Sequence, residues 1–243
     1  MTIQYRHHAQ SAHRLALYWA PPVGSALATI GAAWLGRDTT GARLGDRPVL
    51  QGFDAERLVQ LTEAPRHYGL HATLKPPFSL AEGSDEAQLG AAIDAAARQI
   101  APFMMPPLQL RLLDGFLALV PAAPCPALDD LAARCVADFD GFRRPAPAAE
   151  LARRRASGLS RRQDDNLLRW GYPYVFEDFR FHVTLTGRLD PAEADRLQPL
   201  LATLFAPAIG MPFEVNDVTL FVQDEAALPF YQRWRFSLTG RGS

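Results

Sequence analysis

The sequence has few cysteines and no long hydrophobic run, and each shortage excludes a class of protein. Its 243 residues contain two cysteines, Cys125 and Cys135, which are too few for a disulfide scaffold or a zinc site built from cysteines. No apolar stretch reaches the roughly 20 residues that a membrane-spanning helix needs, and no signal peptide is recognisable. We therefore expect a cytoplasmic protein that does not enter a membrane.

An excess of charge of one sign is also missing. The 25 Lys and Arg residues nearly balance the 26 Asp and Glu residues, for a formal net charge of −1. A dedicated duplex-DNA binder carries a marked basic excess, so the composition argues against that class. Lys75 is the only lysine, and eight arginines gather between residues 143 and 169. We interpret residues 141–170 as an Arg-rich helical connection, either a solvated face or a basic wall beside an anionic substrate.

One short pattern, H-x-T-L, occurs twice, at residues 71–74 and 182–185. Each copy lies in a stretch typical of a β-strand, residues 68–75 and 179–186, where polar and apolar side chains alternate. A single short motif arises easily by chance. Two copies in matching contexts indicate a paired site instead.

The strand context places the polar residues of each motif on one face, because residues two apart in a strand point the same way. His71, Thr73 and Lys75 are predicted to share a face. His182 and Thr184 are predicted to share a face in the second copy, with apolar residues behind them. Each strand would then present an imidazole and a hydroxyl to a site while its other face packs in a core.

Each H-x-T-L strand is followed in the sequence by a predicted helix and then by a predicted antiparallel hairpin. We predict helices over residues 24–35, 54–63, 84–100, 126–139, 147–156, 161–170 and 191–205, and further strands over 14–20, 108–112, 116–120, 213–222 and 230–238, with a hairpin turn at Asp114-Gly115. Residues 1–12 read as a loose tail. The expected fold class is α+β. Two pseudo-symmetric lobes, residues 13–140 and 160–243, each have an antiparallel sheet flanked by helices, and a cleft lies between them.

Paired imidazoles suit the hydrolysis of a phosphodiester. One base activates the attacking oxygen, one acid protonates the departing oxygen, and histidine titrates close to neutral pH. Thr73 and Thr184 are placed to donate hydrogen bonds to the charge that develops on phosphorus oxygens, and Lys75 could add a positive charge. Either His71 or His182 can be the base. The motif offers one imidazole per strand, so we expect neither a metal nor another cofactor.

The motifs and their flanks resemble the two-histidine phosphoesterase superfamily. Residues 68–78, 170–174 and 181–187 look like its branch from bacterial phosphonate-utilisation operons, described as phosphonate metabolism proteins with a domain of unknown function, and the resemblance covers nearly the whole chain. It implies a metal-independent cyclic phosphodiesterase whose core site is His71, Thr73, His182 and Thr184.

The resemblance leaves several substrates open. A small cyclic phosphate or nucleotide fits the near-neutral charge, and the operon context implies a phosphorylated or cyclic ribose. A 2′,3′-cyclic phosphate at an RNA end is the alternative, as is a module that binds a phosphate ligand without turning it over. Arg66, Tyr68, Tyr172 and Tyr174 are candidates for substrate contact.

Overall fold

The computed structural model describes residues 13–42 and 47–241, and the tail expected at residues 1–12 lies outside them. Its strands are β1 (Arg14–Trp19), β2 (Ala72–Phe78), β3 (Phe103–Met105), β4 (Leu108–Leu113), β5 (Phe116–Pro121), β6 (Val183–Thr184), β7 (Phe213–Val215), β8 (Asp217–Gln223) and β9 (Tyr231–Ser237). Seven of them form one sheet in the order β4-β5-β6-β2-β1-β8-β9, while β3 and β7 pair separately. Every pairing is antiparallel.

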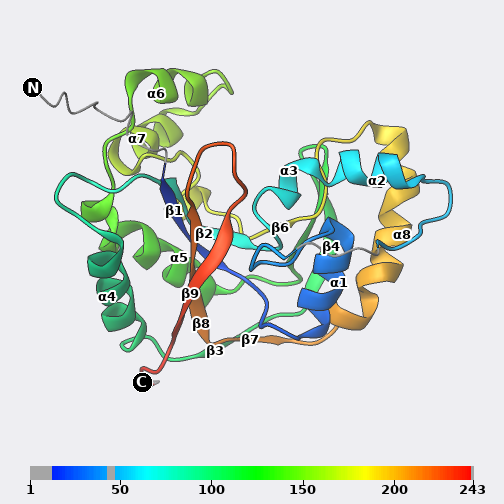
Figure 1. The fold of residues 1–243 in the computed structure, drawn as a ribbon, viewed down its shortest axis with the longest axis horizontal. Helices are drawn as coiled ribbons and strands as arrows, with labels where there is room; N and C mark the ends of the chain where they lie inside the picture. The colour runs from blue at the N-terminus through cyan, green and yellow to red at the C-terminus, as the bar shows by residue number, and fades with distance from the viewer. Residues whose placement is uncertain (1–12, 43–46, 242–243) are drawn as a thin grey trace, which may run out of the picture.

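The α-helices are α1 (Ala26–Leu35), α2 (Ala55–Leu61), α3 (Glu63–Arg66), α4 (Glu86–Ala97), α5 (Pro126–Asp138), α6 (Ala148–Arg155), α7 (Arg161–Trp170) and α8 (Pro191–Ile209), with 3-10 turns η1 (Asp140–Phe142) and η2 (Phe176–Asp178). Helix α5 packs on β2, and α4 packs on β8 and β9. At the other end, α8 packs on α1, β4 and β5 (Figure 1). The helices and the antiparallel strands confirm the predicted α+β class.

The sheet joins the two halves of the chain. The two H-x-T-L strands, β2 and β6, are neighbours at its centre, where Ala72 pairs with Val183. The β4–β5 hairpin pairs with β6, which comes later in the chain, while β8 and β9 add to β1. The hairpin that follows each motif therefore lies on the side of the sheet that holds the other motif strand, directly beside β6 in one case and beyond β1 in the other. The expected lobes, 13–140 and 160–243, contribute to one continuous sheet and do not each have their own.

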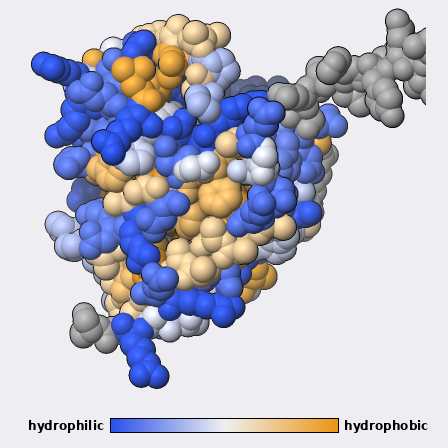
Figure 2. All heavy atoms as spheres, turned by 90° about the vertical axis from the view of Figure 1, so that its left-hand side faces the viewer, coloured by the Kyte–Doolittle hydropathy of each residue, from blue (hydrophilic) through white to orange (hydrophobic). Residues whose placement is uncertain are grey.

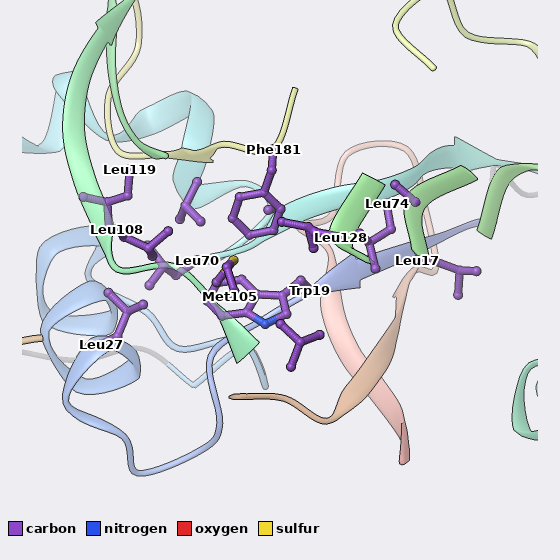
Figure 3. Packing of buried hydrophobic residues seen from close by; sticks show 14 of the residues in the cluster. Leu17, Trp19, Leu27, Leu70, Leu74, Met105, Leu108, Leu119, Leu128 and Phe181 are labelled. Carbon is purple, nitrogen blue, oxygen red and sulfur yellow. The ribbon is translucent and has the colours of Figure 1, made fainter. Parts of the chain in front are cut away.

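Strand β1 shows how the sheet separates a core face from a site face. Leu17 and Trp19 belong to the main hydrophobic cluster, in which Trp19 meets Phe181 with ring centroids 5.4 Å apart (Figure 3). Tyr18 points to the opposite face and joins a second, smaller cluster that includes Phe230. The main cluster, packed under the helices, therefore covers one face of the sheet. The imidazole of His71 lies on the other face, against Tyr18.

A bulge in β2 changes which residues share a face. Leu17 pairs with Lys75 but Tyr18 pairs with Thr73, so Leu74 is an extra residue on β2. An extra residue resets the side-chain alternation. Lys75 consequently turns toward the helices instead of sharing a face with Thr73, and the prediction for its position is wrong.

Most predicted local signals are confirmed, with a few shifts. Asp114 and Gly115 both have positive φ, 46° and 88°, as the hairpin turn requires. Ser160 caps α7 through a capping box. The α4 cap is Asp85 and not Ser84. The single strand expected over 213–222 is two strands, β7 and β8, which belong to different sheets.

The face drawn in Figure 2 carries mostly hydrophilic side chains around smaller hydrophobic areas. Within the part of the chain that the structure describes, no helix combines the length and apolar character needed to cross a membrane.

Candidate active site

The antiparallel pairing of β2 with β6 brings the motif residues together. With Ala72 opposite Val183, antiparallel geometry sets His71 opposite Thr184 and Thr73 opposite His182. The imidazole of each motif therefore has the hydroxyl residue of the other as its cross-strand neighbour. The predicted pairing of the two motifs in space is thus present in the fold.

The two imidazoles are anchored in the same way. The Nδ1 atom of His71 lies 2.9 Å from the carbonyl oxygen of Gly69, and the Nδ1 atom of His182 lies 2.7 Å from that of Arg180. A carbonyl oxygen only accepts hydrogen bonds, so each Nδ1 is the protonated donor. When either ring is neutral, its Nε2 therefore carries the lone pair that can take up a proton. On the His71 side, the Oγ1 atom of Thr73 lies 3.5 Å from Nε2.

The surroundings of the two rings differ. His71 packs against Tyr18, with ring centroids 4.0 Å apart, and against Tyr68 at 5.5 Å. Burial lowers the pKa of His71 to about 4, opposed by the hydrogen bond to Gly69 and reinforced by the charge of His182. The effect of the His182 charge on His71 shows that the two imidazoles lie within electrostatic reach. His182 contacts the ring of Phe116 at 5.9 Å.

A cavity of about 620 Å³ opens beside the motifs, a volume typical of small-molecule sites. Thr73 and His182 line it, together with the turn after β4, the start of α7 and the segment from Tyr172 to Arg180. The cavity therefore joins both motifs with the end of the Arg-rich segment.

Lys75 lies away from this cavity. Its amino group donates a hydrogen bond to the carbonyl oxygen of Val136 at 2.9 Å and lies 3.8 Å from Asp140. The side chain is 1% exposed, and burial lowers its pKa to about 8. A role for Lys75 in binding the phosphate is therefore not supported.

The other candidates for substrate contact divide into two groups. Tyr172 and Tyr174 line the cavity and meet edge to face at 5.5 Å. Tyr68 stacks on Phe230 beside His71. The Arg66 side chain does not line the cavity, and its positive charge lowers the pKa of Arg47.

Half of the eight arginines in the Arg-rich segment form ion pairs with nearby carboxylates. Arg143 pairs with Asp140, and Arg154 and Arg155 pair with Glu150 and Asp164. Arg162 does line the cavity, but its Nε and one terminal nitrogen, Nη2, donate hydrogen bonds to the two carboxylate oxygens of Asp178. These arginines therefore have the structural role of a solvated face.

Sequence reasoning missed three residues at the site. Tyr18 contacts His71 from β1, and its strand gave no polar signal. Arg180 and Arg188 line the cavity and, within residues 13–42 and 47–241, neither forms an ion pair or a side-chain hydrogen bond. Their nearness in sequence to His182 was a usable signal. Asp114 and Glu177 line the same cavity, so the wall carries both signs of charge.

Metal-binding side chains do not gather here. Among the described residues, no group of three or more His, Cys, Asp or Glu side chains has the arrangement of a metal site.

Comparison with known proteins identifies the family. A family model described as protein of unknown function (DUF1045) matches residues 73–231, and the chain belongs to this family. This match, together with two relatives named PhnN, confirms the resemblance of the motifs to the phosphonate-operon branch of the two-histidine phosphoesterase superfamily.

Two curated relatives are named ribose 1,5-bisphosphate phosphokinase PhnN. The chain is 37% identical to the protein of Janthinobacterium sp. (strain Marseille) over 241 residues, which cover 96% of this chain and 52% of the relative. It is 39% identical to the protein of Laribacter hongkongensis (strain HLHK9) over 219 residues, which cover 89% and 50%. The chain thus spans about half the length of the curated relatives it matches.

A solved structure is also similar. The Escherichia coli LigT protein, crystallised in complex with 3′-AMP, aligns with 93% of this chain and 98% of its own at 16% identity and a TM-score of 0.43. A similarity at that level carries no argument about function.

Proposed function

We propose that this protein hydrolyses a cyclic phosphodiester on a phosphorylated ribose by acid–base catalysis with His71 and His182. The observation that carries the proposal is the matched anchoring of the two imidazoles, each with Nδ1 fixed on a carbonyl oxygen. The pairing of β2 with β6 places the two imidazoles on neighbouring strands, and one cavity is lined by His182 of the second motif and Thr73 of the first. Such a pair of imidazoles supplies the base and the acid that phosphodiester hydrolysis needs.

The unequal surroundings support a division of roles between the two imidazoles. A base must be unprotonated at the working pH, and the lowered pKa of His71 keeps that imidazole neutral. In this proposal His71 is the base that takes a proton from the attacking water. His182 is then the acid that protonates the departing sugar oxygen, and Thr73 and Thr184 donate hydrogen bonds to the phosphoryl oxygens.

The names of the relatives support the class of substrate. A protein named ribose 1,5-bisphosphate phosphokinase acts on ribose 1,5-bisphosphate. Hydrolysis of ribose 1,2-cyclic phosphate 5-phosphate yields that compound: water adds to phosphorus, the bond from phosphorus to O2 breaks, and O2 takes up a proton. Arg180 and Arg188, which line the cavity, supply positive charge for the second phosphate group.

The phosphokinase activity in those names is not proposed for this chain. A nucleotide-dependent phosphokinase of the P-loop type uses a lysine and a glycine-rich loop to hold phosphates. Lys75 is the sole lysine, its amino group is bound to Val136, and the sequence has no such loop.

Phosphorus NMR on a panel of cyclic phosphodiesters tests the proposal. The panel holds ribose 1,2-cyclic phosphate with and without a 5-phosphate, nucleoside 2′,3′-cyclic phosphates, and a short RNA ending in a cyclic phosphate. We expect the 5-phosphorylated ribose to open fastest to a monoester, and turnover to be unchanged by EDTA. Faster opening of the RNA end would favour the RNA alternative, and binding without turnover would favour a non-catalytic module.

A further inference from the structure

Two tyrosine side chains pack beside His71, and a third, from another part of the chain, interacts electrostatically with both of them. Tyr18 comes from β1, Tyr68 precedes β2 and Tyr172 follows α7. The rings of Tyr18 and Tyr68 both pack against His71. Burial raises the pKa of Tyr18, and the next-largest cause is Tyr68, with Tyr172 also raising it. The three phenol groups thus lie within electrostatic reach of one another, and Tyr172 also lines the cavity.

The hydroxyl groups of these tyrosines lack protein partners. Within the described part of the chain, none of the three forms a hydrogen bond, whereas the Tyr231 hydroxyl bonds to Asp224 at 3.1 Å. A buried tyrosine hydroxyl ordinarily finds a partner. Tyr18 is only 1% exposed. Among the described residues, every side-chain nitrogen or oxygen that is completely inaccessible to solvent has a hydrogen-bond partner. The small exposed area of Tyr18 therefore includes its hydroxyl.

We propose that the hydroxyl groups of Tyr18, Tyr68 and Tyr172 form a subsite that binds the sugar hydroxyls of the substrate beside His71. This inference rests on the proposed function and extends it to the part of the substrate that does not react.

The chemistry of the cluster favours a sugar over a phosphate group. A phenol both donates and accepts hydrogen bonds, as vicinal sugar hydroxyls do, whereas an ionised phosphate only accepts and is held best by charged donors. The two arginines whose charges act on the cluster already hold polar partners, Arg14 with Gln223 and Arg154 with Glu150, and Arg154 lies over the face of the Tyr172 ring at 5.2 Å, not at its hydroxyl. Neutral donors therefore dominate this end of the site.

Calorimetry with two probes tests the subsite without requiring turnover. Ribose 5-phosphate and inorganic phosphate are titrated into the wild type, Tyr18→Phe and Tyr231→Phe. Tyr18→Phe keeps the ring against His71 and removes only the hydroxyl. We expect it to weaken ribose 5-phosphate by roughly three- to tenfold, the value of one neutral hydrogen bond, and inorganic phosphate by less than about twofold. Tyr231→Phe should change neither.

Three results would overturn the subsite. They are equal affinity of the wild type for both probes, unchanged binding of ribose 5-phosphate by Tyr18→Phe, and equal weakening of both probes. The last result would mean that the hydroxyl acts on the phosphate or on His71. A failure of the proposed function shows separately, as absence of turnover by the wild type. If turnover occurs, Tyr18→Phe should raise KM and change kcat by less than about twofold.

Discussion

At the scale of single residues, the two imidazoles have equivalent anchors and unequal surroundings. Both hold Nδ1 on the carbonyl oxygen two residues earlier, yet the His71 ring packs against two tyrosine rings while His182 contacts one phenylalanine. Burial is what separates them, because it disfavours the charged form of His71. A pair of equivalent motifs can thus supply one base and one acid.

The lowered pKa of His71 makes folding stability depend on pH. The unfolded chain protonates this imidazole below pH 6.5, but the folded chain does so only near pH 4. Its contribution is therefore fully present above pH 6.5 and is lost as the pH falls toward 4. Between pH 7 and 5, the wild type should lose about 1–2 kcal/mol more than His71→Gln in urea unfolding. Equal losses would mean that the ring titrates normally.

The motif residues were predictable and their neighbours were not. The alternation within each H-x-T-L stretch is a local property, so it placed His71 and Thr73 on one face correctly. The position of Lys75 depends on the bulge in β2, which arises from pairing with β1. The contact of Tyr18 with His71 likewise crosses between strands. Both depend on a register between distant segments, which no local pattern specifies.

At the scale of elements, the β4–β5 turn joins the sheet to the cavity wall. Phe116, directly after the turn, contacts His182, and Asp114 lines the cavity. Arg188 lies over the turn, with a terminal nitrogen 3.5 Å from where a Cβ on Gly115 would stand. The turn signal in the sequence was strong because two consecutive residues need positive φ.

Gly115→Ala should lower the free energy of unfolding, mainly because alanine is strained in the backbone conformation of Gly115 and less because the added Cβ crowds its neighbours. Its φ of 88° lies in the left-handed region, which costs an alanine about 1–2 kcal/mol. Chemical denaturation should show a loss of that size. Gly141→Ala is the matched control, since nothing lies within 4 Å of the added Cβ and its φ is not positive, and it should change stability by less than about 0.5 kcal/mol. Similar losses for both variants would contradict the strained turn.

At the scale of the whole molecule, the exchanged hairpins bind the two halves together. Strand β5 of the β4–β5 hairpin pairs with β6, while β8 of the β8–β9 hairpin pairs with β1. Apart from a few short elements such as β3, which were not predicted, the elements were predicted in the right order, and the internal repeat predicted that the two motifs meet. It could not specify which hairpin extends which motif strand, because both hairpins have compatible lengths and alternation.

The exchange predicts that the halves do not fold alone. A fragment of residues 13–140 would leave β2 without β6 and β1 without β8, exposing sheet edges and apolar faces. We expect this fragment to lack cooperative thermal unfolding by circular dichroism. Mixing it with a fragment of residues 141–241 should restore part of the transition. A cooperative transition in the first fragment alone would show two independent lobes.

The most direct test of the account is the turnover of ribose 1,2-cyclic phosphate 5-phosphate by His71→Ala and His182→Ala, with His13→Ala as the matched control. His13 pairs with Glu86 and Asp224, and its replacement should leave turnover unchanged. Each site variant should lose about 10²- to 10⁴-fold in kcat, and the double variant should lose less than the product of the two, because the imidazoles act as a unit. A loss below about tenfold for either site variant would contradict paired-histidine catalysis.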